Sequence, residues 1–379
     1  MNEDRIGQGI IGGSSGLAAA LCITLLGTHW PYSPPKPDPV EEARRLQLGP
    51  SGPGGPISAP SAPSGPDGLL QGDLFAMRTY AKVEPGGIGA AGFQWLSTPE
   101  PGSWRSGAGR KEGHQDFLAY TRSQLGQDDP RRQALVLRAV GPWPQHRRYL
   151  IPDITRFLTV YFQRPVRWED PIGLGSEHRL SRDGARAHLQ YPTGPILQQL
   201  RRELPRDALA VVGITAADIY PASSWQFVFG LADLRERVAV VSHHRLHPEF
   251  QGLDPTPERR ALASVRFLRV LAHEIAHTLG LTHCVTFQCI MNGCNSLDEQ
   301  DQAPLHLCPV CLAKLAWRLR WRIEARYGGL AHLLYKLRLP GASRFFRRQF
   351  ARLQPLSPTP EVLLGPRRAT YTQRGSPPG

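Results

Sequence analysis

One short segment concentrates residues that can hold a metal ion and move a proton. His273, Glu274 and His277 form a His-Glu-x-x-His motif. Histidines four residues apart lie one turn apart on a helix, so both imidazoles can reach one ion. The glutamate between them can face a water molecule at that ion. The motif therefore indicates a metal-dependent hydrolytic site.

The motif continues through Gly280 to His283, giving HEIAHTLGLTH. A third ligand six residues beyond His277 reaches the same ion only if the chain turns back, and glycine tolerates the positive φ that this turn needs. Three imidazoles leave the fourth position of a zinc ion open for water, as a catalytic site requires. The apolar residues around the motif indicate burial, where unpaired histidines and a glutamate would be costly without a metal. We therefore predict a catalytic zinc bound by His273, His277 and His283.

The cysteines suggest a second metal site directly downstream. Four residues separate Cys284 from Cys289, and two separate Cys308 from Cys311. Two short-spaced pairs suit a closed tetrahedral thiolate site for a structural zinc, whereas two disulfides or free thiols are the alternative. Five of the six cysteines cluster in this part of the chain, unlike those of a disulfide-rich secreted protein. Cys294 lies within the cluster, and we expect it to be a small loop residue outside the ligand set.

A long helix must present the first two histidines. Thr256 can cap this helix, Pro257 suits its first turn, and an apolar stripe at spacings of three and four leads to Gly280, where the helix should end. Upstream, His243 and His244 are expected at a solvated strand end. The predicted strands cover residues 134–140, 166–168, 207–215, 225–234 and 237–246, with the last two forming a hairpin, and the predicted helices cover 151–163 and 195–204. This alternation predicts an α/β fold with a mixed, twisted sheet and covering helices.

These motifs resemble those of a known family. HEIAHTLGLTH is similar to the elongated motif of the metzincin clan of zinc peptidases, and CVTFQCIM and LCPVC are similar to the archaemetzincin branch. The segment VVGITAADIYPASSWQFVFG resembles that family upstream of the active-site helix, so the resemblance covers about residues 130–330. It implies a metzincin-like α+β fold with a zinc-bound C-terminal subdomain.

The resemblance also implies roles for individual residues. The chain would hydrolyse peptide or protein substrates with two Zn²⁺, one catalytic and one structural. Glu274 would be the general base, and Met291 would form the tight turn beneath the histidine ligands. By analogy with the clan, the 225–246 hairpin would offer an edge strand to an extended peptide. The zinc ligands would be His273, His277 and His283 at the catalytic site and Cys284, Cys289, Cys308 and Cys311 at the structural site.

Two other functions stay open at this point. A zinc-stabilised, non-catalytic binding protein on a peptidase fold, associated with a membrane through either end, is the main alternative. Glu274 favours the enzyme, because a pure scaffold has no need of it. A third hypothesis is a redox-switched enzyme, in which oxidation of the cysteine cluster releases the structural zinc.

The rest of the chain is unusual in composition. It has 379 residues, a formal charge of +13 and 41% hydrophobic residues, which exclude wholesale disorder, while 38 glycines and 36 prolines predict long irregular stretches. We expect a cytoplasmic location, with anchoring or export through the apolar residues 9–28 as the alternative. The expected divisions are an apolar leader at 1–30, a Gly/Pro-rich linker at 31–125, a catalytic domain at 130–330, basic amphipathic helices at 331–354 and a disordered tail at 355–379.

The C-terminal region is strongly basic. Eleven lysines or arginines and a single acid lie between Lys314 and Arg352, interleaved with leucines and aromatic residues. Such a segment could bind a membrane surface or nucleic acid. We favour helices that pack on the catalytic core with a solvated arginine face, because the sequence holds no nucleic-acid motif.

Overall fold

A mixed five-stranded sheet forms the centre of the described structure. The computed structural model describes residues 69–107, 112–123, 129–147, 150–181 and 187–354, all within the unit Pro37–Gly379. The strand order is β2-β1-β5-β8-β7, and all neighbours are parallel except the antiparallel pair β7 and β8. A second, smaller sheet has three strands in the order β3-β4-β6. The strands are β1 (Ala134–Val140), β2 (Val166–Ile172), β3 (Arg179–Leu180), β4 (Leu189–Pro192), β5 (Ala208–Thr215), β6 (Asp218–Tyr220), β7 (Gly230–Asp233) and β8 (Val238–Ser242).

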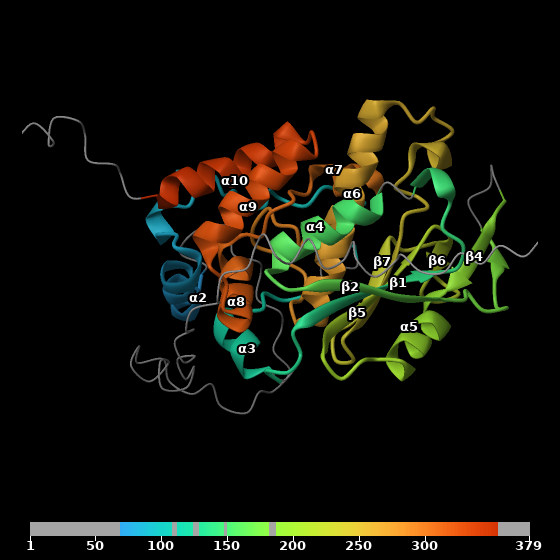
Figure 1. Cartoon of the computed structure of the whole chain (residues 1–379). Coiled ribbons are helices and arrows are strands. Elements are labelled where there is room, and N and C mark those ends of the chain that lie inside the picture. Colours follow the sequence, from blue (N-terminus) through green and yellow to red (C-terminus); the bar gives the residue numbers. More distant parts are fainter. Residues whose placement is uncertain (1–68, 108–111, 124–128, 148–149, 182–186, 355–379) are drawn as a thin grey trace, which may run out of the picture. The chain divides into compact units, whose positions relative to one another are not determined.

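Helices cover both faces of the large sheet (Figure 1). Alternate residues of a strand point to opposite faces, and β1 follows this rule: Leu135 and Leu137 join one apolar cluster, Val136 and Val140 the other. The first cluster includes α4 and α6, and the second includes Ile196 of α5. These helices are α4 (Leu150–Phe162), α5 (Thr193–Arg202) and α6 (Pro257–Thr278). The predicted α/β fold with a mixed sheet and covering helices is confirmed.

The helix α6 has the predicted cap and the predicted end. The Thr256 hydroxyl accepts a hydrogen bond from the Arg259 amide, and Pro257 occupies the first turn. The helix ends at Thr278, and Gly280 follows with a φ of 87°. This left-handed conformation reverses the chain, so the loop after Gly280 returns along the end of the helix.

The segment before β1 differs from the sequence expectation. We predicted a loose linker to residue 125 and ordered structure from near residue 130, yet residues 69–107 and 112–123 hold α2 (Gln71–Ala76), a π-helical turn (Met77–Ala81) and α3 (Phe117–Arg122). Met77, Phe93 and Phe117 are buried in the large apolar cluster. These few apolar side chains find partners on distant elements, chiefly α8, and this tertiary burial outweighs the Gly-rich composition.

The described chain is helical from Leu297 onward. It contains α7 (Leu297–Gln302), α8 (Pro309–Leu319), α9 (Ile323–Lys336) and α10 (Pro340–Leu353). α9 and α10 lie side by side, and α9 packs on α4, with Leu330, Leu334 and Phe346 in the core (Figure 1). Arg344, Arg347 and Arg348 are exposed. The helices therefore pack on the catalytic core, and α10 turns an arginine face to solvent.

The apolar leader and the tail lie outside the described residues. Among the residues described, no helix combines the length and the hydropathy that crossing a bilayer demands.

Candidate active site

The three predicted histidine ligands converge on one point. α6 carries His273 and His277, and the loop after Gly280 carries His283. One nitrogen from each ring lies within 4.8 Å of the others, and Nε2 of His273 is 2.9 Å from Nε2 of His277. The turn at Gly280 therefore brings His283 to the helix end, as the spacing predicted.

The other nitrogen of each ring is fixed by a hydrogen bond. Nδ1 of His273 donates to the Ile290 carbonyl at 2.8 Å, and Nδ1 of His277 donates to the Leu281 carbonyl at 2.6 Å. Nδ1 of His283 donates to the carboxylate of Glu112, at 2.9 and 3.0 Å. An imidazole anchored in this way presents its free nitrogen as a lone pair, which is the arrangement that metal-binding histidines adopt.

Burial sets the protonation of the site. It lowers the pKa of His273 to about 3, with a smaller contribution from His283. Burial also holds the pKa of His277 well below its ordinary value. Both rings are therefore neutral at neutral pH, as metal ligands must be. The donor set, its spacing and its charge state fit a zinc ion.

Glu274 is buried and lies against the sheet. Desolvation raises the pKa of its carboxyl group to about 8. A Cβ atom placed on Gly230, the first residue of β7, would lie only 2.6 Å from Cγ and 2.8 Å from Oε1 of Glu274. Because Gly230 has no side chain, β7 packs directly against the Glu274 side chain.

The histidines and Glu274 line one wall of a cavity of about 800 Å³. β7 and the segment before it also line the cavity, where Trp225, Phe227 and Phe229 supply aromatic surface. This volume lies within the range of about 300–1,000 Å³ that ligand sites occupy. The cavity is therefore large enough for a short peptide segment.

A further part of the lining comes from residues that the sequence did not single out for the site. The Trp104 ring packs against His283 in a tilted arrangement with ring centroids 4.4 Å apart, and the Trp104 amide donates to Glu299 at 2.8 Å. Gln115 donates to the Gly280 carbonyl at 3.0 Å and accepts from the Thr282 amide at 3.3 Å. The segment predicted to be a loose linker thus holds the loop of the third histidine. Only the isolated tryptophan in a Gly-rich stretch offered a signal.

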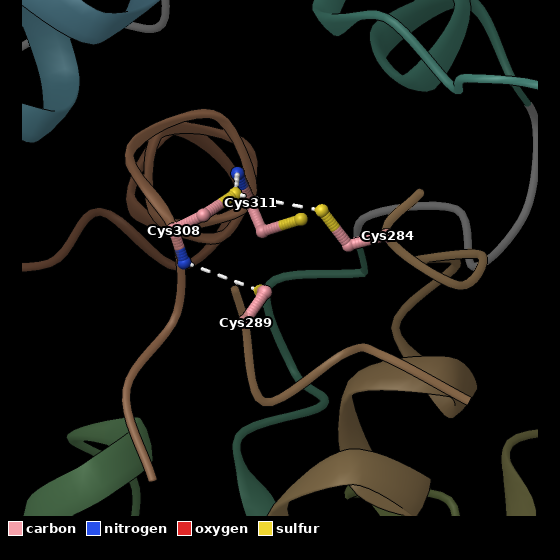
Figure 2. Close-up of side chains that lie close together, drawn as sticks. All are labelled: Cys284, Cys289, Cys308 and Cys311. Carbon is pink, nitrogen blue, oxygen red and sulfur yellow. Dashed lines mark hydrogen bonds between the residues drawn. The ribbon is translucent and has the colours of Figure 1, made fainter. Parts of the chain in front are cut away.

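The four predicted cysteines form a second group. Their sulfurs lie within 4.8 Å of one another, and all four are buried and unoxidised. Cys308 and Cys311 lie at the start of α8, and Cys284 and Cys289 lie in the loop between α6 and α7. Figure 2 shows the two pairs facing each other. Sγ of Cys284 is 3.8 Å from Sγ of Cys308.

The hydrogen bonds of this group favour a thiolate at Cys284, whereas burial raises the pKa of Cys289 and that of Cys308 well above their ordinary range. The Cys308 amide donates to Sγ of Cys289 at 3.2 Å, and the Cys311 amide donates to Sγ of Cys308 at 3.4 Å (Figure 2). Cys308 also caps α8, whose amino end carries partial positive charge. Hydrogen bonds from the other three thiols hold the pKa of Cys284 well below its ordinary range. Four such ligands without a disulfide fit a structural zinc site.

Cys294 stands apart from these ligands. It is half-buried, lines the cavity and contacts the Gln300 side chain at 3.8 Å. Burial raises the pKa of its thiol to about 12, so it is a neutral thiol.

A third group, His188, Asp218 and His244, also lies within 4.8 Å, but its carboxylate is already occupied. Both oxygens of Asp218 accept from Arg245, and Oδ2 also accepts from His188 and Gln190, each at 2.7 Å. A cation would find no free acceptor there and would meet the arginine, so this group is a buried ion-pair network.

The expected solvated strand end at His243 is wrong. His243 is fully buried and packs edge-on against Phe267, with ring centroids 4.8 Å apart, while His244 is half-buried.

Comparison with known proteins places the chain in a family. Residues 190–317 match the profile of a family described as peptidase family M54. Archaemetzincin-2 of Mus musculus is 30% identical over 267 residues, which cover 63% of this chain and 74% of the mouse protein. This chain belongs to the archaemetzincin family. Human archaemetzincin-1 is 37% identical over 173 residues, covering 39% of this chain and 34% of that protein. The solved archaemetzincin of Methanopyrus kandleri is 28% identical, with 52% of this chain and 99% of that chain covered and a TM-score of 0.39.

Membership of the archaemetzincins supports a zinc-dependent metallopeptidase, a hydrolase that acts on peptides or proteins. The histidine and cysteine groups described above lie within residues 190–317, which match the family profile.

Proposed function

We propose that this chain hydrolyses peptide bonds at the site formed by His273, His277 and His283, with Glu274 as general base. The observation that carries the proposal is the convergence of three imidazole nitrogens beside a buried carboxyl group in one cavity. The ligands, the base and the motif HExxHxxGxxH together favour the metzincin mechanism. A bound zinc ion supplies Lewis acidity, which polarises a carbonyl and makes water more acidic.

The chain's own residues would supply the remaining chemistry. Glu274 would accept the proton of the attacking water and deliver it to the leaving amine. Burial raises the pKa of this carboxyl group above that of a solvated glutamate, which makes its carboxylate a stronger base. Glu112 would keep Nδ1 of His283 protonated and so direct its other nitrogen at the metal.

The substrate would lie along β7. This strand pairs with β8 on one side only, within the part of the chain that the structure describes, and Gly230, Leu231 and Ala232 line the cavity. An extended peptide can pair with the free edge of such a strand through main-chain hydrogen bonds. The close approach of Gly230 to Glu274 would bring the bound main chain beside the base.

We further propose two zinc ions per chain, with the second held by Cys284, Cys289, Cys308 and Cys311. Met291 is fully buried, and its carbonyl accepts from the Cys284 amide at 2.7 Å. Met291 would thus form the tight turn between the two sets of ligands. The cytoplasmic location and membrane contact stay predictions, which cell fractionation of the full chain would test.

The experiment is cleavage of a peptide library by zinc-loaded protein, read by mass spectrometry beside a Glu274→Gln variant. We expect cleavage by the wild type and none by the variant, with the same zinc content in both. If the zinc-loaded wild type cleaves no peptide, the alternative of a non-catalytic, zinc-stabilised binding protein takes precedence.

A further inference from the structure

Arg269 occupies an unusual place in the active-site cavity. It lies four residues before His273 on α6, so Arg269, His273 and His277 follow one another along one face of the helix. Arg269 lines the same cavity of about 800 Å³ as these histidines and Glu274. A strong positive charge is thus built into the wall that carries the metal ligands.

The guanidinium group is buried with part of its hydrogen-bonding capacity unused. The residue is 6% exposed. Nη1 donates to the Gln300 carbonyl, but Nε is buried and has no hydrogen-bond partner among the described residues. Burial lowers the pKa of Arg269 to about 10, so the side chain is still cationic at neutral pH.

Among the described residues, the acid that raises the pKa of Arg269 is Asp301, and this acid is shared with Arg266. The neighbouring Asp301 is bound on both oxygens by Arg266, at 2.7 and 2.5 Å. Cys294 is a neutral thiol. Of the two acids of the cavity, Glu112 accepts a hydrogen bond from His283, and burial raises the pKa of Glu274 to about 8, which favours its neutral form.

Arg269 also borders a second cavity, of about 490 Å³, and no acid comes from that side. Its lining is mostly apolar, and its further ionisable residues are His306 and Arg338. Arg338 adds a like charge. A buried cation without a counter-ion of its own is costly, and an anionic group that enters the active-site cavity would remove that cost.

We propose that Arg269 is a specificity-determining residue that binds a carboxylate of the peptide substrate close to the scissile bond. The inference rests on the proposed function of the histidine site. Four residues of helix rise about 6 Å, whereas one residue of an extended peptide spans about 3.3 Å. The carboxylate therefore belongs to a residue within about two positions of the cleaved bond, either as an aspartate or glutamate side chain or as a free chain end.

The test uses four matched peptides with a common cleavage sequence. They carry glutamate or glutamine at the two positions on each side of the scissile bond and end in a free acid or an amide, which separates the two sources of the carboxylate. The proteins are wild type, Arg269→Gln, Arg269→Lys and Arg266→Gln, all zinc-loaded. Arg266 is the matched control, because it lies on the same helix with similar burial but pairs with Asp301 and does not line the active-site cavity.

We expect the wild type to prefer one carboxylate-bearing peptide over its neutral counterpart by at least about tenfold in kcat/KM. Arg269→Gln should abolish this preference, Arg269→Lys should keep part of it, and Arg266→Gln should keep it whole even if the protein is less stable. Equal cleavage of acidic and neutral peptides by the wild type, or an unchanged preference in Arg269→Gln, would overturn the inference.

A binding measurement separates this inference from the proposed function. The same peptides are titrated against wild type and Arg269→Gln by calorimetry, before any turnover is required. If the protein binds the acidic peptide through Arg269 but cleaves none, the peptidase proposal fails and the carboxylate site stands. If it cleaves both peptides equally, the peptidase proposal stands and the carboxylate site fails.

Discussion

The close contact between β7 and Glu274, the proposed general base, offers a sharp test of the proposed site. Gly230 begins β7, and the Glu274 side chain occupies the space where any other residue would place its Cβ. No positive φ is recorded for Gly230, so its need for glycine comes from this contact and not from backbone conformation. Gly230→Ala should therefore act on Glu274 and leave the metal ligands in place.

The size of the effect follows from the distances. The new Cβ would stand 2.6 Å from Cγ and 2.8 Å from Oε1 of Glu274, which is 0.8 and 0.6 Å short of the 3.4 Å at which ordinary contact begins. Because Glu274 is buried, its carboxylate must shift by a similar amount or β7 must retreat. A displacement of about 1 Å at a catalytic group can cost about a hundredfold in rate. We expect kcat to fall by about thirty- to a hundredfold, or about 2–3 kcal/mol in the barrier.

The assay combines steady-state cleavage of one library-derived peptide with zinc content and thermal unfolding. Overpacking should also lower the stability of Gly230→Ala by about 1–3 kcal/mol. Gly194→Ala is the control, because Gly194 is exposed on α5 with no atom within 4 Å of the added methyl group. That variant should keep its activity and gain up to about 1 kcal/mol of stability.

The reasoning fails if Gly230→Ala is folded, zinc-loaded and as active as wild type. That result would mean that Glu274 is not held against β7 or does not act on the reacting water. A fall in zinc content with the fall in rate would instead assign the effect to the ligands.

Three further predictions concern other groups. Glu112→Gln should weaken zinc binding at the histidine site about ten- to a hundredfold, measured by chelator competition; unchanged affinity would deny the role of Glu112 in orienting His283. Cys308→Ser should lower bound zinc by about one equivalent and reduce the unfolding temperature, whereas full zinc content would exclude the cysteine group as a ligand set. Asp218→Asn removes the carboxylate that faces buried Arg245 and should cost about 3–5 kcal/mol in denaturant unfolding, with zinc content unchanged; a loss below about 1 kcal/mol would contradict the network's structural role.

Local pattern predicted the framework of the fold well. The β1 strand has the predicted bounds, α4 differs by one residue at each end, and Thr256 and Gly280 act as the cap and the turn that their residue types indicate. The 225–246 hairpin exists but is shorter than predicted, because β7 starts only at Gly230. The apolar pattern does not show that residues 225–229, which line the cavity, lie before the strand and not within it.

The missed parts of the site are those that depend on contacts far apart in the chain. Glu112 reaches His283 across 171 positions, and no motif links them. Arg269 carries no signal in the sequence either, because an arginine on an amphipathic helix normally faces solvent. The same holds for His243, which is buried against Phe267 of α6 and Trp143.

The loop between α6 and α7 joins the two proposed metal centres at adjacent residues, His283 and Cys284. The segment before β1 pairs with this loop through a short antiparallel bridge: the Leu96 amide donates to the Thr286 carbonyl at 3.0 Å, and the Gln288 amide donates to the Gln94 carbonyl at 2.9 Å. A shift in the cysteine group would be transmitted through one peptide bond to the third histidine. The cysteine group and the segment before β1 therefore act on the same histidine loop, and the geometry of the proposed catalytic site depends on both.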